Sequence, residues 1–209
     1  SAEPIKFCYY KNLGHIDRYC SLIGMNDPLN FFIGNYDKYC LLNKKWTNLA
    51  VKQIKNKNFT KVSIDKISSN LTYGANGTLY KKKFLKNLRE KNYFFDVDIL
   101  NHLIHKKRNY FAKTNQCIIH YYCKNNYFKF YKKQSRRIND FLKYKKLRKK
   151  KNNLKGCIYF IISCVLVLPI ISQALKLFVR SRDISSLNHI ILVYITLFTY
   201  SYHFTKKLF

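Results

Sequence analysis

Two uncharged, apolar segments dominate the hydrophobic pattern, and both lie in the last quarter of the chain. Residues 156–175 form the first segment, whose 20 positions contain no charged side chain. At about 1.5 Å rise per residue, a helix of that length crosses a hydrocarbon core of roughly 30 Å. Residues 184–205 form the second segment, in which threonine, serine and histidine interrupt the apolar positions. The pattern predicts two membrane-spanning helices, with a buried core helix as the alternative for each.

The distribution of lysine and arginine around these segments predicts their orientation. Residues 176–183, between the two segments, carry a net charge of +2, whereas the stretch 143–151 before the first segment contains seven basic residues. Lysine and arginine near membrane spans are enriched on the cytoplasmic side. We therefore expect an antiparallel hairpin with both ends on that side, where Lys206 and Lys207 also fall.

Upstream of residue 156 the apolar pattern is shorter and more aromatic, and it is interpreted as helical. Residues 16–20 and 36–40 share an echo of Tyr and Cys, which predicts two short helices that place these side chains against a core. Apolar residues recur at spacings of three and four towards position 104, as in an amphipathic helix. Residues 114–155 are predicted to continue as an aromatic-rich helix, with a short strand around position 118 as the alternative.

The predicted fold class is all-α, a basic helical domain followed by a C-terminal two-helix transmembrane hairpin. A loop rich in Gly and Asn around positions 68–78 divides the part outside the membrane, because Gly and the Asn-Gly pair favour turn conformations. The expected parts are an N-terminal helical part (1–78), a basic, aromatic-rich helical region (79–155) and the membrane hairpin (156–205).

Positive charge indicates an anionic partner. The chain has 40 Lys and Arg against 10 Asp and Glu, a formal net charge of +30. Residues 99–155 alone contain 18 basic side chains and one acidic one. Such a field favours either the anionic leaflet of a membrane or the phosphates of nucleic acid, for which the interleaved Tyr and Phe would offer stacking surfaces.

The lipid interpretation is preferred because the densest basic run lies directly before the first apolar segment. Each Lys or Arg near an anionic surface contributes about 1 kcal/mol to binding. We call this run the basic collar and expect it to contact anionic lipid headgroups or other phosphates; its members are Lys143, Lys145, Lys146, Arg148, Lys149, Lys150, Lys151 and Lys155.

Seven cysteines are spaced irregularly, and two of them lie in the first apolar segment. One disulfide among Cys8, Cys20 and Cys40 is expected if the domain folds in an oxidising lumen, and reduced, partly buried thiols are the alternative. Two metal-like sets were weighed and neither is predicted to bind a metal, because the helix of the first is already explained by packing and the second lacks a fourth ligand. The sets are Asp98, His102 and His105, and Cys117, His120 and Cys123.

Motifs for catalysis are missing from the sequence: there is no phosphate-binding loop, no Gly-x-Ser-x-Gly elbow and no His-Glu-x-x-His. The prediction is a protein that is not an enzyme and uses no cofactor. The chain starts at Ser1 instead of Met, which we interpret as removal of a secretory signal or organelle transit peptide, or as truncation.

The C-terminal plan, a Lys-rich run followed by apolar segments of which the first contains Leu168-Pro169-Ile170, resembles the exported two-span membrane proteins of malaria parasites (Plasmodium). The resemblance covers about a quarter of the chain and implies a multigene-family protein of the parasite surface or of exported membranes, which passes through the secretory route. It implies no catalytic residues.

The function predicted from sequence is membrane-anchored binding or scaffolding, with the basic collar on anionic lipid and the domain on a protein partner. The expected location is a membrane of the secretory pathway, an exported membrane or, alternatively, an organelle. The alternative function is that of a subunit of an organellar ribosome or respiratory assembly, in which the basic aromatic region binds RNA or partner subunits. A+T-rich genomes also produce such Lys-rich, Tyr-rich subunits.

Overall fold

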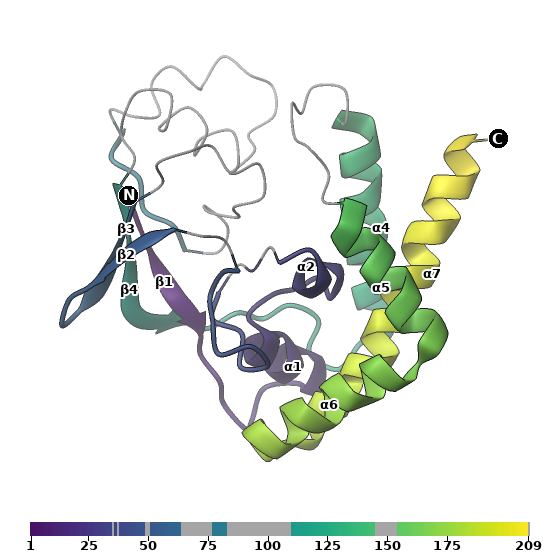
Figure 1. Cartoon of the computed structure of the whole chain (residues 1–209), viewed down its shortest axis with the longest axis horizontal. Coiled ribbons are helices and arrows are strands. Elements are labelled where there is room, and N and C mark those ends of the chain that lie inside the picture. Colours follow the sequence, from purple (N-terminus) through teal and green to yellow (C-terminus); the bar gives the residue numbers. More distant parts are fainter. Residues whose placement is uncertain are drawn as a thin grey trace.

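The computed structural model describes residues 1–34, 36, 38–48, 51–63, 77–82, 110–144 and 154–208. A four-stranded sheet lies at one side of the molecule and the helices at the other (Figure 1). The elements are β1 (Ala2–Phe7), α1 (His15–Ile23), α2 (Leu29–Phe32), β2 (Lys52–Lys55), β3 (Phe59–Ser63), β4 (Tyr110–Ile118), α4 (Tyr127–Tyr144), α5 (Leu154–Leu166), α6 (Leu168–Ser181), the 3-10 helix η3 (Ile184–Leu187) and α7 (Asn188–Leu208). The predicted all-α fold is therefore wrong, and the protein is a mixed α/β fold.

The sheet has the order β1-β4-β3-β2 and joins the two ends of the region upstream of α4. Strand β1 pairs in parallel with β4, whereas β3 pairs antiparallel with both β4 and β2. The pairing of β1 with β4 places Glu3 beside Lys113, although about 110 positions separate them along the chain. Residues 64–76 and 83–109, which include the predicted amphipathic helix before position 104, lie outside the described residues.

Charged side chains occupy buried positions of the two paired strands. Glu3 and Lys113 are almost completely buried, and so is Lys38 from the loop after α2. The Glu3 carboxylate contacts the ammonium groups of both lysines, with 3.4 Å between Lys38 Nζ and Glu3 Oε2. Lys113 Nζ also lies 4.5 Å from the ring centroid of Trp46, within cation–π distance. A buried ion cluster thus stands where a sheet usually buries apolar side chains.

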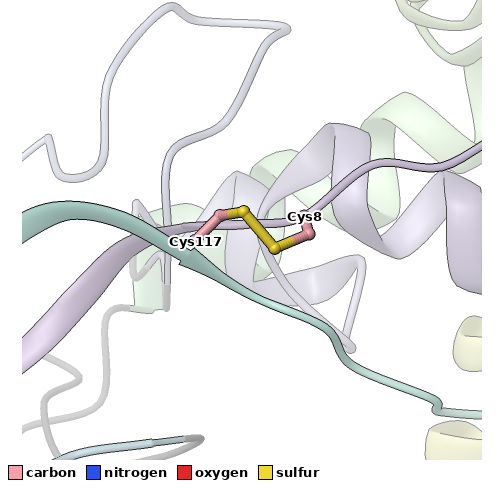
Figure 2. The surroundings of a disulfide bond; sticks show 2 residues. All are labelled: Cys8 and Cys117. Atoms are coloured by element: carbon pink, nitrogen blue, oxygen red, sulfur yellow. A yellow bond between two sulfur atoms is a disulfide. The ribbon is translucent and has the colours of Figure 1, made fainter.

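A disulfide between Cys8 and Cys117 joins β4 to the residue that follows β1 (Figure 2). The parallel pairing of β1 with β4 places the Cα atoms of the two cysteines 4.9 Å apart. The pairing differs from the one expected among Cys8, Cys20 and Cys40, because Cys20 and Cys40 are free thiols packed in the helical core. Burial raises the pKa of Cys40 to about 11 and raises the pKa of Cys20 well above its ordinary value, which keeps both thiols protonated and poorly reactive.

The largest apolar cluster lies around α1 and includes side chains of the C-terminal helices. Tyr19 and Ile23 of α1 pack in one core with Leu177 of α6 and Leu192 of α7. The first predicted short helix is present as α1, whereas Cys40 lies in a turn bridged to Lys45. Because the C-terminal helices complete the main core, they belong to the same folded unit as the N-terminal part.

The first apolar segment does not form one straight helix. It divides into α5 and α6, whose axes meet at 93°. Pro169, near the start of α6, lacks the N–H that would continue the helix ladder, and the residue before a proline is biased away from helical conformation. Val167 sits at the break with φ of +61°, a conformation that a β-branched residue rarely adopts. Of the two predicted spans, the first is therefore a bent helix pair in the structure and the second is one long helix.

Candidate functional site: an apolar surface on the C-terminal helices

Beyond Lys155 in its first turn, helix α5 carries no charged side chain on any side, yet the protein covers only a narrow stripe of it. The buried positions are Gly156, Phe160, Ser163 and Cys164, whose spacings of three and four place them on one face. A Cβ at Gly156 would lie 2.7 Å from the Cα of Ile33, so the close approach of α5 to the end of α2 requires glycine. Helices that are hydrophobic all round are typical of protein interiors or lipid. The exposed sides of α5 lack the polar face expected against water.

Exposed apolar side chains are concentrated on the three C-terminal helices. Among the described residues, eighteen of the twenty-eight large apolar side chains that are exposed lie between Leu154 and Phe204. Large exposed apolar patches mark interaction sites for proteins, membranes or ligands. We call this set the apolar surface: Leu154, Ile158, Tyr159, Ile161, Ile162, Val165, Leu166, Val167, Leu168, Leu175, Phe178, Val179, Ile184, Leu187, Ile191, Phe198, Tyr202 and Phe204.

The most exposed part of this surface is the turn between α5 and α6, residues 165–168, which we call the elbow. Val165 and Leu168 are each 74% exposed. The elbow lies on the outer side of the helical part, away from the sheet (Figure 1). Its inner side is held by Ile170, which is fully buried, and by a hydrogen bond of 2.8 Å from the Tyr194 hydroxyl to the Cys164 carbonyl near the end of α5.

Basic residues stand at both ends of the uncharged stretch that contains the elbow. Lys155 precedes it and Lys176 follows it, and both side chains are exposed. Arg182, also exposed, follows the end of α6. Of the basic collar, Lys143 and Lys155 are exposed on α4 and α5, and the members from Lys145 to Lys151 lie outside the described residues. The apolar elbow therefore has positive charge at its base and none at its tip.

The turn that leads into α7 is bonded to the N-terminal part. Asp183 accepts a hydrogen bond from the Tyr9 hydroxyl and lies 3.2 Å from the Arg18 guanidinium. It also accepts from the Ser185 backbone N–H at 2.7 Å and so begins η3. Burial tends to raise the pKa of the Asp183 carboxyl, but the hydrogen bonds from Tyr9 and Ser185 and the charge of Arg18 outweigh it and lower that pKa.

Polar contacts also line the inner face of α7 and its far end. The Tyr200 hydroxyl donates to Asp27 at 2.6 Å and lies 3.2 Å from the Gln134 side-chain oxygen on α4. His189 lies 2.8 Å from the Tyr19 hydroxyl. Near the C-terminal end, the Lys207 ammonium donates to the Leu142 carbonyl of α4 at 2.8 Å. Both ends of α7 are thus bound to the same folded domain.

In the part of the chain that the structure describes, one helical stretch, Ile184–Lys207, is long and apolar enough to cross a membrane, and the bent pair of α5 and α6 passes the same test only when counted as one span. Half of the stretch is buried inside the protein, as in a core helix. Of the two predicted spans, sequence favoured the first more strongly, but in the structure the first is the broken one. Sequence reasoning treated the elbow as the middle of that span, although Pro169 was a signal for the break.

A second exposed face, on α4, combines aromatic and basic side chains. Phe128 and Tyr131 stack with their ring centroids 6.1 Å apart, and the Lys132 ammonium lies 4.6 Å from the Phe128 centroid. Lys129 and Arg136 extend the basic part of the exposed face. Such a face suits phosphates and stacked bases, and within the described residues it is one exposed part of the predicted basic aromatic region.

Of the two metal-like sets, the one within the described residues does not come together as ligands. Among the described residues, no three His, Cys, Asp or Glu side chains are placed to hold a metal ion. Cys117 forms the disulfide, and the His120 ring stacks on Phe7 with centroids 5.0 Å apart. Asp98, His102 and His105 lie outside the described residues.

Comparison of the chain with protein-family models, with curated proteins and with solved structures finds no match.

Proposed function

We propose that the protein is a membrane-associated, non-enzymatic binding or scaffolding protein whose C-terminal helices attach a folded α/β domain to an anionic lipid surface. The proposal is carried by helix α5, which has no charged side chain beyond Lys155 and is covered by protein only along the stripe of Gly156, Phe160, Ser163 and Cys164. Transfer of apolar surface from water into lipid or a partner is favourable by about 25 cal/mol per Å². The positive charge of the chain favours an anionic bilayer as the recipient.

The proposed location is a membrane of the secretory pathway or an exported membrane. The Cys8–Cys117 disulfide supports this location, because disulfides persist in oxidising compartments and are rare in the cytosol. It favours the oxidising side of the membrane for the folded domain, opposite to the cytoplasmic side that the distribution of Lys and Arg predicted. In this proposal the sheet and α1 form the body that meets a protein partner, while the C-terminal helices hold that body at the membrane.

Vesicle flotation of the purified full-length protein tests the proposal. We expect the protein to float with vesicles that contain phosphatidylserine and to bind less to vesicles of phosphatidylcholine alone, with the difference reduced by high salt. A protein that stays at the bottom of the gradient with both vesicle types would overturn the proposal. Carbonate extraction of membranes from expressing cells gives the same test in a cell.

The α4 face favours a second candidate, a subunit of an organellar ribosome or respiratory assembly that binds RNA or partner subunits. Phe128, Tyr131 and Lys132 offer stacking and phosphate contacts there. In that case a partner subunit would cover the apolar surface. Substitution of Lys129 and Lys132 by Gln would then weaken salt-sensitive RNA binding, and the protein would show little affinity for vesicles.

A further inference from the structure

We propose that the elbow between α5 and α6 inserts into one leaflet of an anionic bilayer, while α7 stays packed on the folded domain. This inference rests on the proposed membrane association and adds how the protein meets the membrane. The occupant of the apolar surface is thus the acyl region of a single leaflet, with phosphate headgroups against the basic residues at the base of the elbow.

Helix α7 is not available to be surrounded by lipid, because it is bonded to the folded domain. Asp183, at the start of the η3 turn that leads into α7, contacts Arg18, and Lys207 at the end of α7 contacts the α4 backbone. Tyr200, on the inner face, shares Asp27 with Arg137 of α4, whose guanidinium lies 3.6 Å from that carboxylate. A crossing by α7 would either break these contacts or carry charged residues of α4 into hydrocarbon, which costs several kcal/mol per charge.

The distribution of charge along the bent pair of α5 and α6 favours insertion into one leaflet. Residues 156–175 contain no charged side chain, and Lys155 and Lys176 mark their limits. In a straight helix these two charges would lie about 30 Å apart on opposite sides of a bilayer. The bend of 93° brings the two arms back towards the same side, so both ammonium groups can meet the same layer of headgroups.

The depth that the elbow can reach also favours insertion into one leaflet. From Gly156 to Leu166 the first arm measures about 16 Å at 1.5 Å per residue, and from Leu168 to Leu175 the second measures about 12 Å. With the arms inclined equally to the bilayer, the angle of 93° puts the tip about 8 to 11 Å below the basic residues, by the same rise per residue. Interfacial helices bury their apolar faces by about 5 to 10 Å. The elbow therefore matches one leaflet and is too short to cross two.

The most exposed apolar side chains of these helices lie at the elbow. Val165 and Leu168 flank the tip of the elbow, and each is 74% exposed. The buried stripe of α5 faces Phe32 of α2, with the rings of Phe32 and Phe160 5.0 Å apart at their centroids. The concave side of the elbow is thus filled by protein, and its convex side is the part left to enter lipid.

The test compares three variants of the full-length protein in flotation with phosphatidylcholine–phosphatidylserine vesicles. The double substitution Val165→Asp and Leu168→Asp should lower the vesicle partition coefficient at least about tenfold, because the transfer of one such side chain alone is worth that factor. Leu79→Asp is the matched control, since Leu79 is 75% exposed outside the apolar surface, and it should leave binding unchanged. Phe198→Asp, on the exposed face of α7, should lower binding less than the elbow variant does.

Two further readouts keep the result independent of folding of the elbow variant. Val165→Trp adds an indole at the elbow, and its fluorescence should be quenched more by lipids brominated along the upper acyl chain than by lipids brominated at the bilayer centre. Trp46 gives the background, which the wild type measures. Protease added outside the vesicles should leave no protected fragment that contains 184–207.

The outcomes separate this inference from the proposed function. A wild type that fails to bind vesicles overturns both. A wild type that binds, together with an elbow variant that binds equally well, overturns the elbow alone. Protection of the 184–207 fragment, or quenching only at the bilayer centre, also overturns the single-leaflet geometry while the membrane association stands.

Discussion

Substitution of Asp17 is the sharpest test of how the fold is held together. Asp17 is fully buried in the first turn of α1, and its Oδ1 accepts hydrogen bonds from the backbone N–H groups of Tyr122, Cys123 and Lys124 at 3.0, 2.6 and 2.9 Å. These residues form the loop between β4 and α4. One carboxylate oxygen thus joins α1 to the connection that carries the chain from the sheet to the helices.

The size of the effect follows from the number of donors. Asp17→Ala leaves three buried N–H groups without this acceptor, and each such loss costs about 1 to 3 kcal/mol. We expect a loss of about 4 kcal/mol or more in the free energy of unfolding, a large part of the roughly 5 to 15 kcal/mol of a typical domain. Asp17→Asn keeps an oxygen of the same shape but removes the charge, and charged hydrogen bonds are roughly twice as strong as neutral ones. Its loss should be about half as large.

Urea unfolding followed by circular dichroism measures both variants. Asp140→Ala, a substitution of the same chemistry at a half-buried position of α4, is the control and should change stability by no more than about 0.5 kcal/mol. The reasoning is wrong if Asp17→Ala loses less than about 1 kcal/mol, the lower bound for a single buried donor. Equal losses for Ala and Asn would show that the oxygen acceptor is not what matters.

Three further changes probe the sheet. Removal of the disulfide by Cys8→Ser and Cys117→Ser opens a loop with a sequence separation of 109. The free energy of unfolding in urea should fall by about 4.7 kcal/mol. An unchanged unfolding midpoint, or a wild type whose stability does not respond to reductant, would contradict this prediction. Burial and the charge of a nearby lysine lower the pKa of His120 in the folded protein. The unfolded state therefore takes up the proton first, and stability should fall as the pH drops below 6.5, the ordinary pKa of histidine. His120→Phe should flatten that part of the curve of stability against pH. Glu3→Gln should lower the free energy of unfolding by about 3 to 5 kcal/mol, the usual effect of breaking a buried ion pair. Adding Lys113→Met should restore part of the lost stability. If thermal unfolding shows no recovery in the double variant, the loss does not come from the ion pair.

Apart from the alternative of a short strand around position 118, where β4 ends, the sheet was not predicted, because its buried positions do not look buried in the sequence. Strands are recognised by apolar residues that alternate with polar ones. In β1 and β4 the inward positions include Glu3 and Lys113, which pair with each other, so the alternation is obscured by charge. Strand β2 is exposed at all four positions, and the partner of β1 lies about 110 positions away. A local pattern carries no information on such a long-range pairing.

The disulfide was mispaired for the same reason. Cys8, Cys20 and Cys40 were grouped because they are neighbours in the sequence, whereas the parallel pairing of β1 with β4 selects Cys117 as the partner of Cys8. The first of the two Tyr and Cys echoes was correctly placed against a core, since Tyr19 and Cys20 are buried in α1. A helix of nine residues can be recognised from local spacing, whereas a partner 109 positions away cannot.

The membrane signal illustrates what composition leaves undecided. Both C-terminal segments are uncharged, yet α7 turns its inner face towards polar partners such as Asp27 and Gln134, whereas α5 is covered by protein only along one narrow stripe. Polar contacts on a buried face favour a helix that stays on its domain, because hydrocarbon offers Asp27 no compensating partner. The bend at Val167 then leaves the elbow of α5 and α6 as the part exposed to solvent or lipid. The segment that sequence identified as the stronger span is therefore the better candidate for a membrane contact, but as a wedge in one leaflet.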